Sequence, residues 1–328
     1  MWRDTYKVSK IEGYPLAWDR RDMDEALHSW VTHRMGEWFD IGAWRCRFHR
    51  AGHIPGAVMV EIETPEAKIL WTGDMDTRDS PSVLGAKPVE CDILFLEGTY
   101  GNRIHPKRMG EERKLVDRVL EIVDRGGTAL IPAFASGRGQ DILQILRREA
   151  PNLEVHYHGM GTRVTKHWMD HPEAVRDPKG LAKTWRWCRR VSSKSDRRKA
   201  LEADAIVTTS GMLDGGPAIW YANRLRHSGN NAILLTGYQA EDSGGRLLLD
   251  ERKLRIYGDI VPIDIEVEQL SLSNHGGQKE LVDFARACNP KHTVIFHADE
   301  ESREALNILL GEEMMVHLPP NQTEILLG

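Results

Sequence analysis

The chain has 328 residues, a length that suits either two domains or one large α/β unit. Hydrophobic residues make up 41% of it, enough for an extended core, and the formal net charge of -5 excludes a surface that is basic overall. Any contact with nucleic acid therefore needs a local basic patch. The four cysteines are scattered, which excludes a Cys-x-x-Cys metal clip and is typical of a reducing cytoplasm. No apolar run approaches the roughly 18 residues of a membrane span, and the N-terminus lacks a signal-peptide core.

The first half of the chain changes from a helical to a strand-like pattern. Residues 1–40 are polar, and DRRDMDEALHSWV carries apolar positions at helical spacing, so we expect this region to be helical. From Trp44 onward, short apolar or alternating runs are bounded by Gly, Pro, Asp or Thr, which is typical of strands. These runs are WRCRFH, AVMVEIE, AKILWTG and CDILFLE.

Strands and helices alternate through the rest of the chain. A helix is predicted over residues 107–125, and Gly126 and Gly127 end it. The later strand candidates are TALIPAFAS, LEVHYH, DAIVTTSG, NAILLTGY, IDIEVEQLSLS and HTVIFH, and the later helix candidates are GRGQDILQILRREA, VTKHWMDH and GGQKELVDFARAC. This alternation predicts an α/β fold.

Residues that can bind metal or move protons recur where the predicted strands end. They are His53, Asp74, Glu97, His275 and His297. Strand ends in layered α/β folds converge on one rim, and a rim with imidazole and carboxylate groups suits zinc. Each residue alone is weak evidence, because His and Asp are common in turns that contain glycine. The prediction depends on all five residues, each within its own local motif.

The motifs around these residues, in this order, resemble the β-CASP branch of metallo-β-lactamase-fold nucleases. This branch includes the RNA endonuclease of mRNA 3′-end cleavage, its archaeal relatives and RNase J. AGHIPGA and WTGDMD are similar to the family's third and fourth metal motifs, and LEGTYGNRIH is similar to the motif that opens the β-CASP insertion. LSLSNHGGQKELVDF and VIFHADEE are similar to two further motifs of the insertion. The resemblance covers about residue 40 to about residue 305.

The resemblance implies a fold and its domain boundaries. We expect a metallo-β-lactamase αββα sandwich, built from residues 1–106 and 247–328, with an inserted α/β β-CASP domain over residues 107–246. The family's His-x-His-x-Asp-His motif does not occur in this sequence, and VHYHGMG, which holds the only His-x-His, does not replace it. We therefore expect a sandwich that is incomplete at its N-terminus. An exposed apolar sheet face and poor solubility are expected consequences.

The resemblance also implies roles for the five residues. His53, Asp74 and His297 correspond to ligands of two zinc ions, and Asp74 corresponds to the carboxylate that bridges them. Because the ligands of the absent motif are missing, we expect this chain to bind zinc weakly or incompletely. The family's usual Ala-Asp after His275 is Gly-Gly here, so one nearby carboxylate is also absent. His275 corresponds to a catalytic group beside the leaving oxygen, and Glu97 to the carboxylate that orients it.

The function implied is zinc-dependent hydrolysis of RNA phosphodiester bonds by a ribonuclease of RNA processing or degradation. RNA is expected rather than DNA because His297 stands where the DNA-repair branch tends to have Val. The substrate would be single-stranded RNA, contacted by the Gly-rich turn at Ser210, Gly211 and Met212. A homodimer or an RNA-processing complex in the cytoplasm is expected.

Two other functions compete with this one. The chain could be an inactive scaffold homologue or fragment in an RNA-processing complex, since such relatives lose metal ligands. A small-molecule metallo-hydrolase is less favoured, because such enzymes lack the insertion motifs.

Two further features of the sequence, a pair of histidines and a basic segment, have structural interpretations that are favoured over functional ones. His167 and His171 lie four apart but lack the zinc-protease Glu, which favours a surface helix. The basic segment 185–199 could contact RNA, but a solvated segment with tryptophans in the core is favoured.

Overall fold

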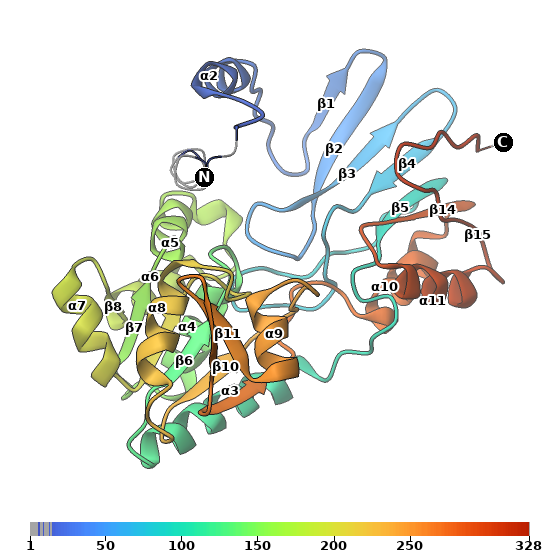
Figure 1. The fold of residues 1–328 in the computed structure, drawn as a ribbon. Coiled ribbons are helices and arrows are strands. Elements are labelled where there is room, and N and C mark those ends of the chain that lie inside the picture. Colours follow the sequence, from blue (N-terminus) through green and yellow to red (C-terminus); the bar gives the residue numbers. More distant parts are fainter. Residues whose placement is uncertain (1–5, 7–8, 10–12, 14, 328) are drawn as a thin grey trace.

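The computed structural model describes Tyr6, Ser9, Gly13 and residues 15–327. Its strands form a seven-stranded sheet, a six-stranded sheet and a separate two-stranded sheet. Figure 1 shows the two large sheets in two lobes, with the first lobe built from both ends of the chain and the second from its middle. The structure therefore has the α/β architecture predicted from the sequence. Among the described residues, no helix combines the length and apolar character that crossing a membrane requires.

The seven-stranded sheet combines an antiparallel part and a parallel part. In spatial order its strands are β1 (Trp38–Ile41), β2 (Trp44–Arg50), β3 (Val58–Glu63), β4 (Lys68–Trp71), β5 (Ile93–Glu97), β14 (His292–Phe296) and β15 (Met315–His317). The pairs from β1 to β4 are antiparallel, and those from β4 to β15 are parallel. Helices α10 (Gln278–Cys288) and α11 (Glu300–Leu310) lie beside the half of the sheet formed by β5, β14 and β15 (Figure 1).

The prediction that residues 1–40 are helical is only partly right. Within the described residues, helix α2 covers Arg20–His28, where Asp19 caps it through its side chain. Residues 38–41 form β1 instead, because Gly42 turns the chain with φ +61° and lets Ile41 lie opposite Trp44 in an antiparallel pair. A hairpin of this kind carries no apolar stripe at helical spacing, so the spacing of apolar residues in the sequence did not predict β1.

The two faces of the seven-stranded sheet differ in burial. On one face, Met59, Leu70 and Leu94 are fully buried in a core cluster with residues of α10 and α11. On the other face, Trp71 is 42% exposed and its ring stacks on Phe95, with ring centroids 4.7 Å apart. Phe296 also packs against Trp71, at 4.9 Å. This face of the sheet is therefore only partly covered.

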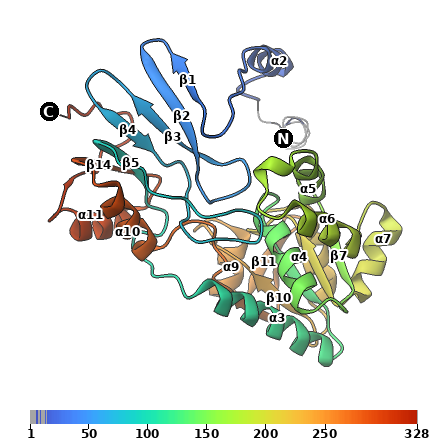
Figure 2. The same cartoon turned by 180° about the vertical axis from the view of Figure 1, so that it is seen from behind.

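The six-stranded sheet is parallel and carries helices on both faces. Its strands, in spatial order, are β13 (Glu266–Gln269), β10 (Ala232–Leu235), β6 (Ala129–Pro132), β9 (Ala205–Thr208), β7 (Val155–His158) and β8 (Arg189–Arg190). Its helices are α3 (Arg108–Asp124), α4 (Arg138–Glu149), α5 (Gly161–Asp170), α6 (Pro178–Trp187), α7 (Lys194–Lys199), α8 (Gly216–Leu225) and α9 (Gly244–Glu251), and two 3₁₀ turns cover Pro172–Ala174 and Ala200–Glu202. Alternate residues of the central strands enter two cores, one with α3 and α4 and the other with α8 and α9. Figure 2 shows the helices of this lobe from behind. Burial on both faces explains the uninterrupted apolar runs of these strands.

The last strand of this sheet lies late in the sequence. β13 pairs in parallel with β10, so the six-stranded sheet includes residues beyond the boundary predicted at residue 246. The antiparallel hairpin β11 (Lys253–Ile256) and β12 (Asp259–Pro262) precedes it and packs Leu254 and Ile256 into the core beneath α8 and α9. From β13 the chain returns to the first lobe through the loop that carries His275.

Candidate metal centre and cleft

The five residues singled out at strand ends come together at one rim of the seven-stranded sheet. Nε2 of His53 lies 3.8 Å from Oδ2 of Asp74, and Nδ1 of His297 lies 3.4 Å from Oδ1 of the same carboxylate. Nδ1 of His275 lies 2.9 Å from Oε1 of Glu97. The rings of His53 and His275 are 4.5 Å apart, so the two pairs form one cluster.

His53 is oriented by a residue of another loop. Its Nδ1 lies 3.0 Å from the backbone carbonyl oxygen of Asn274, to which it donates a hydrogen bond, and this turns Nε2 toward Asp74. A histidine that binds metal usually donates its other ring N–H to such an oxygen. Burial lowers the pKa of His53, and the neighbouring His275 lowers it further. The neutral ring, which is the form that binds metal, is therefore favoured.

Glu97 and His275 form a buried carboxylate–imidazole pair. Glu97 is fully buried and accepts hydrogen bonds from the backbone N–H of Met75, from Thr99 and from Nδ1 of His275. Burial opposes ionisation of Glu97, but the hydrogen bond and positive charge of His275, together with the hydrogen bonds from Thr99 and Met75, outweigh it and lower the pKa of the carboxyl group. Burial likewise opposes protonation of His275, yet Glu97 raises the pKa of its ring. The pair thus presents Nε2 of His275 toward the cluster.

His297 occupies an unusual backbone conformation. Its φ of +50° lies in the left-handed region, which non-glycine residues rarely adopt. The ring is held by Thr99, whose Oγ1 lies 3.1 Å from Nδ1 of His297. Residues held in such conformations cluster at functional sites, where the surrounding structure fixes them.

Three of these residues could hold a metal ion together. Within the part of the chain that the structure describes, His53, Asp74 and His275 are the group whose ligand atoms all lie within 4.8 Å of one another. His297 contacts Asp74 but lies outside this group. Two imidazole nitrogens and one carboxylate oxygen are a set that zinc accepts, and three protein ligands leave a position for water, as in catalytic zinc sites. The donor set therefore fits zinc.

A cleft with a volume of about 990 Å³ opens over this cluster. Both lobes line it, with His53, His275 and His297 from the first and Phe134, Arg138 and Met212 from the second among its residues. Met212 is the one member of the predicted substrate-binding turn that lines the cleft. Gly211 packs instead against the chain at Phe134, where a Cβ would lie 2.9 Å from the backbone nitrogen. A cleft between two lobes is a usual place for a ligand.

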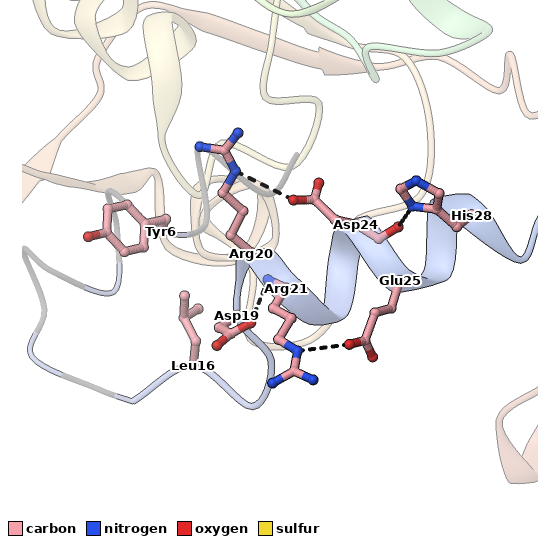
Figure 3. Close-up of a pocket in the computed structure, with 8 residues that line it drawn as sticks. All are labelled: Tyr6, Leu16, Asp19, Arg20, Arg21, Asp24, Glu25 and His28. Carbon is pink, nitrogen blue, oxygen red and sulfur yellow. Dashed lines mark hydrogen bonds and ion pairs between the residues drawn. The ribbon is translucent and has the colours of Figure 1, made fainter.

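Another pocket lies on α2 and is lined by Tyr6, Leu16, Asp19, Arg20, Arg21, Asp24, Glu25 and His28 (Figure 3). The contacts drawn there belong to an exposed helix. Arg21 pairs with Glu25 one turn on, and Nδ1 of His28 lies 2.6 Å from the carbonyl oxygen of Asp24. Such pairs stabilise a helix by a few tenths of a kcal/mol and give no reason to place chemistry in this pocket.

The structure adds residues that the sequence did not single out. Asn274 holds His53 through its backbone oxygen, and its side-chain nitrogen lies 3.3 Å from Oδ2 of Asp141 in the second lobe. Thr99 binds both Glu97 and His297. A backbone carbonyl leaves no signal in a sequence, whereas the hydroxyl of Thr99, two residues after Glu97, could have been suspected.

The histidine pair His167 and His171 and the basic segment 185–199 agree with their plainer interpretations. His171 is exposed at the end of α5 and pairs with Glu173, and neither His167 nor His171 belongs to the candidate metal-binding group found among the described residues. In the basic segment 185–199, Trp185 and Trp187 pack against the core of the second lobe, and the guanidinium of Arg190 stacks on Trp185.

Comparisons with known proteins give the same assignment as the geometry. Residues 140–248 match the Beta-Casp domain, and residues 260–319 match the Zn-dependent metallo-hydrolase RNA specificity domain. The chain is 34% identical to "Probable RNase MJ4" of Methanocaldococcus jannaschii over 91% of its own length and 72% of that protein. It is 29% identical to RNase aCSPSF2 of Saccharolobus solfataricus, with 97% of this chain and 66% of that protein covered.

More distant matches agree. The cleavage and polyadenylation specificity factor 73 of Drosophila melanogaster is 26% identical over 95% of the chain, which spans 48% of that protein. A crystal structure of a protein of unknown function from Enterococcus faecalis V583 shares the fold, with a TM-score of 0.54 and 13% identity over 90% of this chain and 66% of that one. The chain belongs to the β-CASP family of metallo-β-lactamase-fold RNA nucleases.

Proposed function

We propose that this chain hydrolyses phosphodiester bonds of single-stranded RNA at the rim cluster, in a zinc-dependent reaction. The observation that supports the proposal most is the meeting of His53, Asp74 and His297 with the Glu97–His275 pair at one rim, where the three histidines line the cleft. Ligands for a cation and a group able to transfer a proton thus share one space, as hydrolysis of a phosphodiester requires. The relatives named above carry RNase names, which supports RNA as the substrate.

His53, Asp74 and His297 are the proposed zinc ligands, because His297 contacts Asp74 while Glu97 holds His275 for proton transfer. The group of His53, Asp74 and His275 is the alternative set of ligands. A bound zinc ion supplies Lewis acidity and lowers the pKa of its water. Asn274 fixes the tautomer of His53, so that Nε2 stays free to bind the ion. Asp74 is 41% exposed in its side chain and contacts both histidines, which suits a carboxylate shared between ligand positions.

His275 is the proposed proton donor to the leaving oxygen. Glu97 accepts the hydrogen bond from Nδ1, so a proton on Nε2 points away from Glu97 and toward the cleft. The raised pKa of His275 keeps this proton available near neutral pH. Aromatic neighbours restrict the ring further, since Tyr100 lies 6.3 Å from it in an edge-on arrangement.

The zinc content of the purified protein tests the metal part of the proposal. Metal mass spectrometry should give about one zinc ion per chain, the number that a single three-ligand site supports. His53→Ala and Asp74→Ala should each remove most of it. His167→Ala, an exposed histidine on α5, is the matched control and should leave it unchanged. Wild-type protein without zinc would contradict this part of the proposal.

The roles of His275 and His297 are separated by a second pair of variants. His275→Ala should abolish cleavage of a labelled single-stranded RNA and keep the zinc, whereas His297→Ala should lose zinc. If instead His275→Ala loses zinc and His297→Ala keeps it, the metal is assigned to His53, Asp74 and His275, which the distances also allow. Cleavage of single-stranded DNA at the same rate would contradict RNA as the specific substrate.

An inactive scaffold is the second candidate function. The observation that favours it is the size of the metal-binding group, which has three members among the described residues, fewer than two zinc sites need. A protein that binds RNA and partner subunits but neither holds zinc nor cleaves RNA would support this function and contradict the nuclease proposal.

A further inference from the structure

Arg138 is a buried cation that no carboxylate neutralises. Its side chain is 7% exposed, and none of the ion pairs between described residues involves it. Nη1 donates to the backbone carbonyl of Thr236 at 3.0 Å, while Nε is buried without a hydrogen-bond partner. Leaving a buried charge without a counterion costs free energy, so its presence calls for an explanation.

The nearest acidic groups are already engaged. Asp141 lies one helical turn from Arg138, but its Oδ2 accepts from Arg108 at 3.2 Å and its Oδ1 accepts from the backbone of Ser82. Asp76 is held by both nitrogens of the Arg78 fork. Arg108 also pairs with Glu112, at 3.1 Å, and Glu112 is shared with Arg148. Of the guanidinium groups of Arg78, Arg108 and Arg138, that of Arg138 is the one that forms no ion pair among the described residues.

The surroundings of Arg138 disfavour its positive charge when no anion is bound beside it. Burial lowers the pKa of its guanidinium to about 9, and the like charge of Arg108 adds to the shift. Gly137, with φ +90°, starts α4 directly against the site loops, because a Cβ there would lie 2.5 Å from Ile54. The positive end of the α4 dipole therefore adds to the charge of Arg138 at this point.

Arg138 lines the same cleft as the metal centre. Phe134, which is 41% exposed, and Tyr238 line it beside Arg138 and offer ring faces on which bases can stack. Among the described residues that line the cleft, Arg138 is the one arginine or lysine. A guanidinium fork matches two oxygens of a phosphate, which gives the strongest hydrogen bonds that arginine makes.

We propose that Arg138 binds a phosphate group of the RNA strand in the cleft and that this phosphate is its missing counterion. This inference rests on the proposed function, because RNA is the polyanion that it places in the cleft. The phosphate is either an internal phosphodiester of the strand or a 5′-terminal monophosphate. Both present the same oxygens to the guanidinium, and the experiment separates them.

Binding is measured by fluorescence anisotropy in EDTA, so that neither zinc nor cleavage affects the result. The probe is a labelled single-stranded RNA octamer, made with a 5′-hydroxyl and with a 5′-phosphate. Arg138→Gln should weaken binding at least about tenfold and reduce the slope of log K against log salt by about 0.7, the value of one phosphate contact on a single strand. Arg113→Gln removes the same charge from the exposed side of α3, and binding should stay within twofold of wild type.

An effect of Arg138→Gln on both probes indicates an internal phosphodiester, and an effect on the 5′-phosphorylated probe alone indicates the terminal phosphate. Circular dichroism and thermal melting establish that each variant is folded. An affinity of folded Arg138→Gln equal to that of wild type for both probes would overturn the inference.

Octamers that carry one neutral methylphosphonate at successive positions locate the contact. One position should weaken binding to wild type yet have little further effect on Arg138→Gln, since the two changes remove the same interaction. If Arg138→Gln does not fold, Arg138→Lys replaces it in the same comparison. Lysine keeps the charge but lacks the two-pronged guanidinium, so the methylphosphonate at the contact position should weaken binding less than it does in wild type. If, at every position, the loss of affinity caused by the methylphosphonate simply added to the loss caused by Arg138→Gln, the inference would be overturned.

The wild-type chain distinguishes this inference from the proposed function. A wild-type protein that binds no RNA would overturn both. Binding and zinc-dependent cleavage of RNA that do not depend on Arg138 would overturn this inference and leave the proposed function standing.

Discussion

Glu97 shows how one buried side chain can set the chemistry of another. Its carboxylate accepts from Met75, from Thr99 and from His275, so it has partners for both oxygens while it holds the imidazole. Such a group acts through His275 rather than on the substrate, which makes it a positioning residue. The same carboxylate–imidazole arrangement fixes which ring nitrogen carries the proton in many hydrolytic sites.

Replacing Glu97 tests this role. Glu97→Gln keeps the shape but presents an amide, which allows the other tautomer of His275, so kcat for RNA cleavage should fall roughly 10²-fold or more. KM and zinc content should change little, because neither depends on that tautomer. Thr64→Val, a turn residue after β3, is the control. A large fall in zinc content with unchanged kcat per bound zinc would contradict the positioning role.

Glu61 is a second buried carboxylate, and its environment predicts a pH dependence of stability. It is fully buried on β3, with Arg47, His49 and Lys68 around it at 2.6–2.7 Å. Burial opposes its ionisation, but hydrogen bonds from Lys68, His49 and Arg47 outweigh it and lower its pKa from 4.5 to about 2. A folded-state pKa below the unfolded value stabilises the protein above pH 4.5, and this stabilisation is lost as the pH falls toward 2.

The free energy of unfolding should therefore fall by about 3 kcal/mol through Glu61 alone between those pH values. Glu61→Gln should lose a similar amount at pH 7, because it leaves buried cations without their partner, and should flatten this part of the pH profile. Urea unfolding at several pH values measures both effects. Glu63→Gln, an exposed position on the same strand paired with Arg45, should cost under about 1 kcal/mol. Equal effects of the two variants would contradict this prediction.

The loop between β13 and α10 joins the two lobes at the candidate site. Its Asn274 holds His53, while Arg108 and Asp141 of the second lobe hold its side chain through Oδ1 and Nδ2. Arg108 also donates to Oδ2 of Asp141, and both groups are nearly fully buried. A proposed metal ligand in the first lobe, His53, is thus oriented by hydrogen bonds that begin in the second lobe.

Asp141→Asn should loosen this loop and misplace His53. We expect faster hydrogen exchange over residues 272–276 and about tenfold weaker zinc binding, the usual result of disturbing a partner of a metal ligand. Hydrogen-exchange mass spectrometry and zinc titration measure these effects. Asp117→Asn, an exposed position on α3, is the control. Unchanged zinc affinity in a variant with faster exchange would show that the loop does not orient the ligand.

At the scale of the whole molecule, the seven-stranded sheet leaves an apolar face partly exposed. Trp71, Ile41 and Trp44 are 42%, 58% and 50% exposed, and Trp71 continues into the aromatic stack with Phe95. Exposed apolar patches of this kind promote association between molecules. β1 lies at the edge of the same sheet, where free backbone groups can pair with another chain.

Purified alone, the chain should therefore associate. Light scattering after size-exclusion chromatography should show species larger than one chain, and Ile41→Lys with Trp44→Lys should raise the monomer fraction, because charges on an edge strand oppose pairing. Ile308→Lys, which is 72% exposed on α11, changes an isolated apolar residue and should have little effect. A monodisperse monomer at tens of micromolar would contradict this prediction.

A feature of this protein can be predicted from the sequence when it depends on residues within one segment of the chain. The α/β architecture follows from apolar runs and helical spacing within single segments, and β1 was missed because a four-residue hairpin strand has no such signal. The five site residues could be named because each lies at or after the end of a predicted strand and within its own local motif. Asn274 and Arg138 could not, since a backbone carbonyl and an unpaired charge are visible only once the lobes are assembled.

Local patterns in the sequence were enough to predict the fold class, the family through the order of its motifs, and the five residues at the rim. The tertiary structure decided which atoms of those residues meet. His53 and Asn274 are 221 positions apart, yet their hydrogen bond selects the ring nitrogen that faces Asp74. The tertiary structure also brings His275 and His297 within reach of the candidate metal centre and places Arg138 in the cleft lining without an ion pair among the described residues. Side-chain geometry between distant segments depends on how the two lobes pack, and no local pattern of residues encodes it.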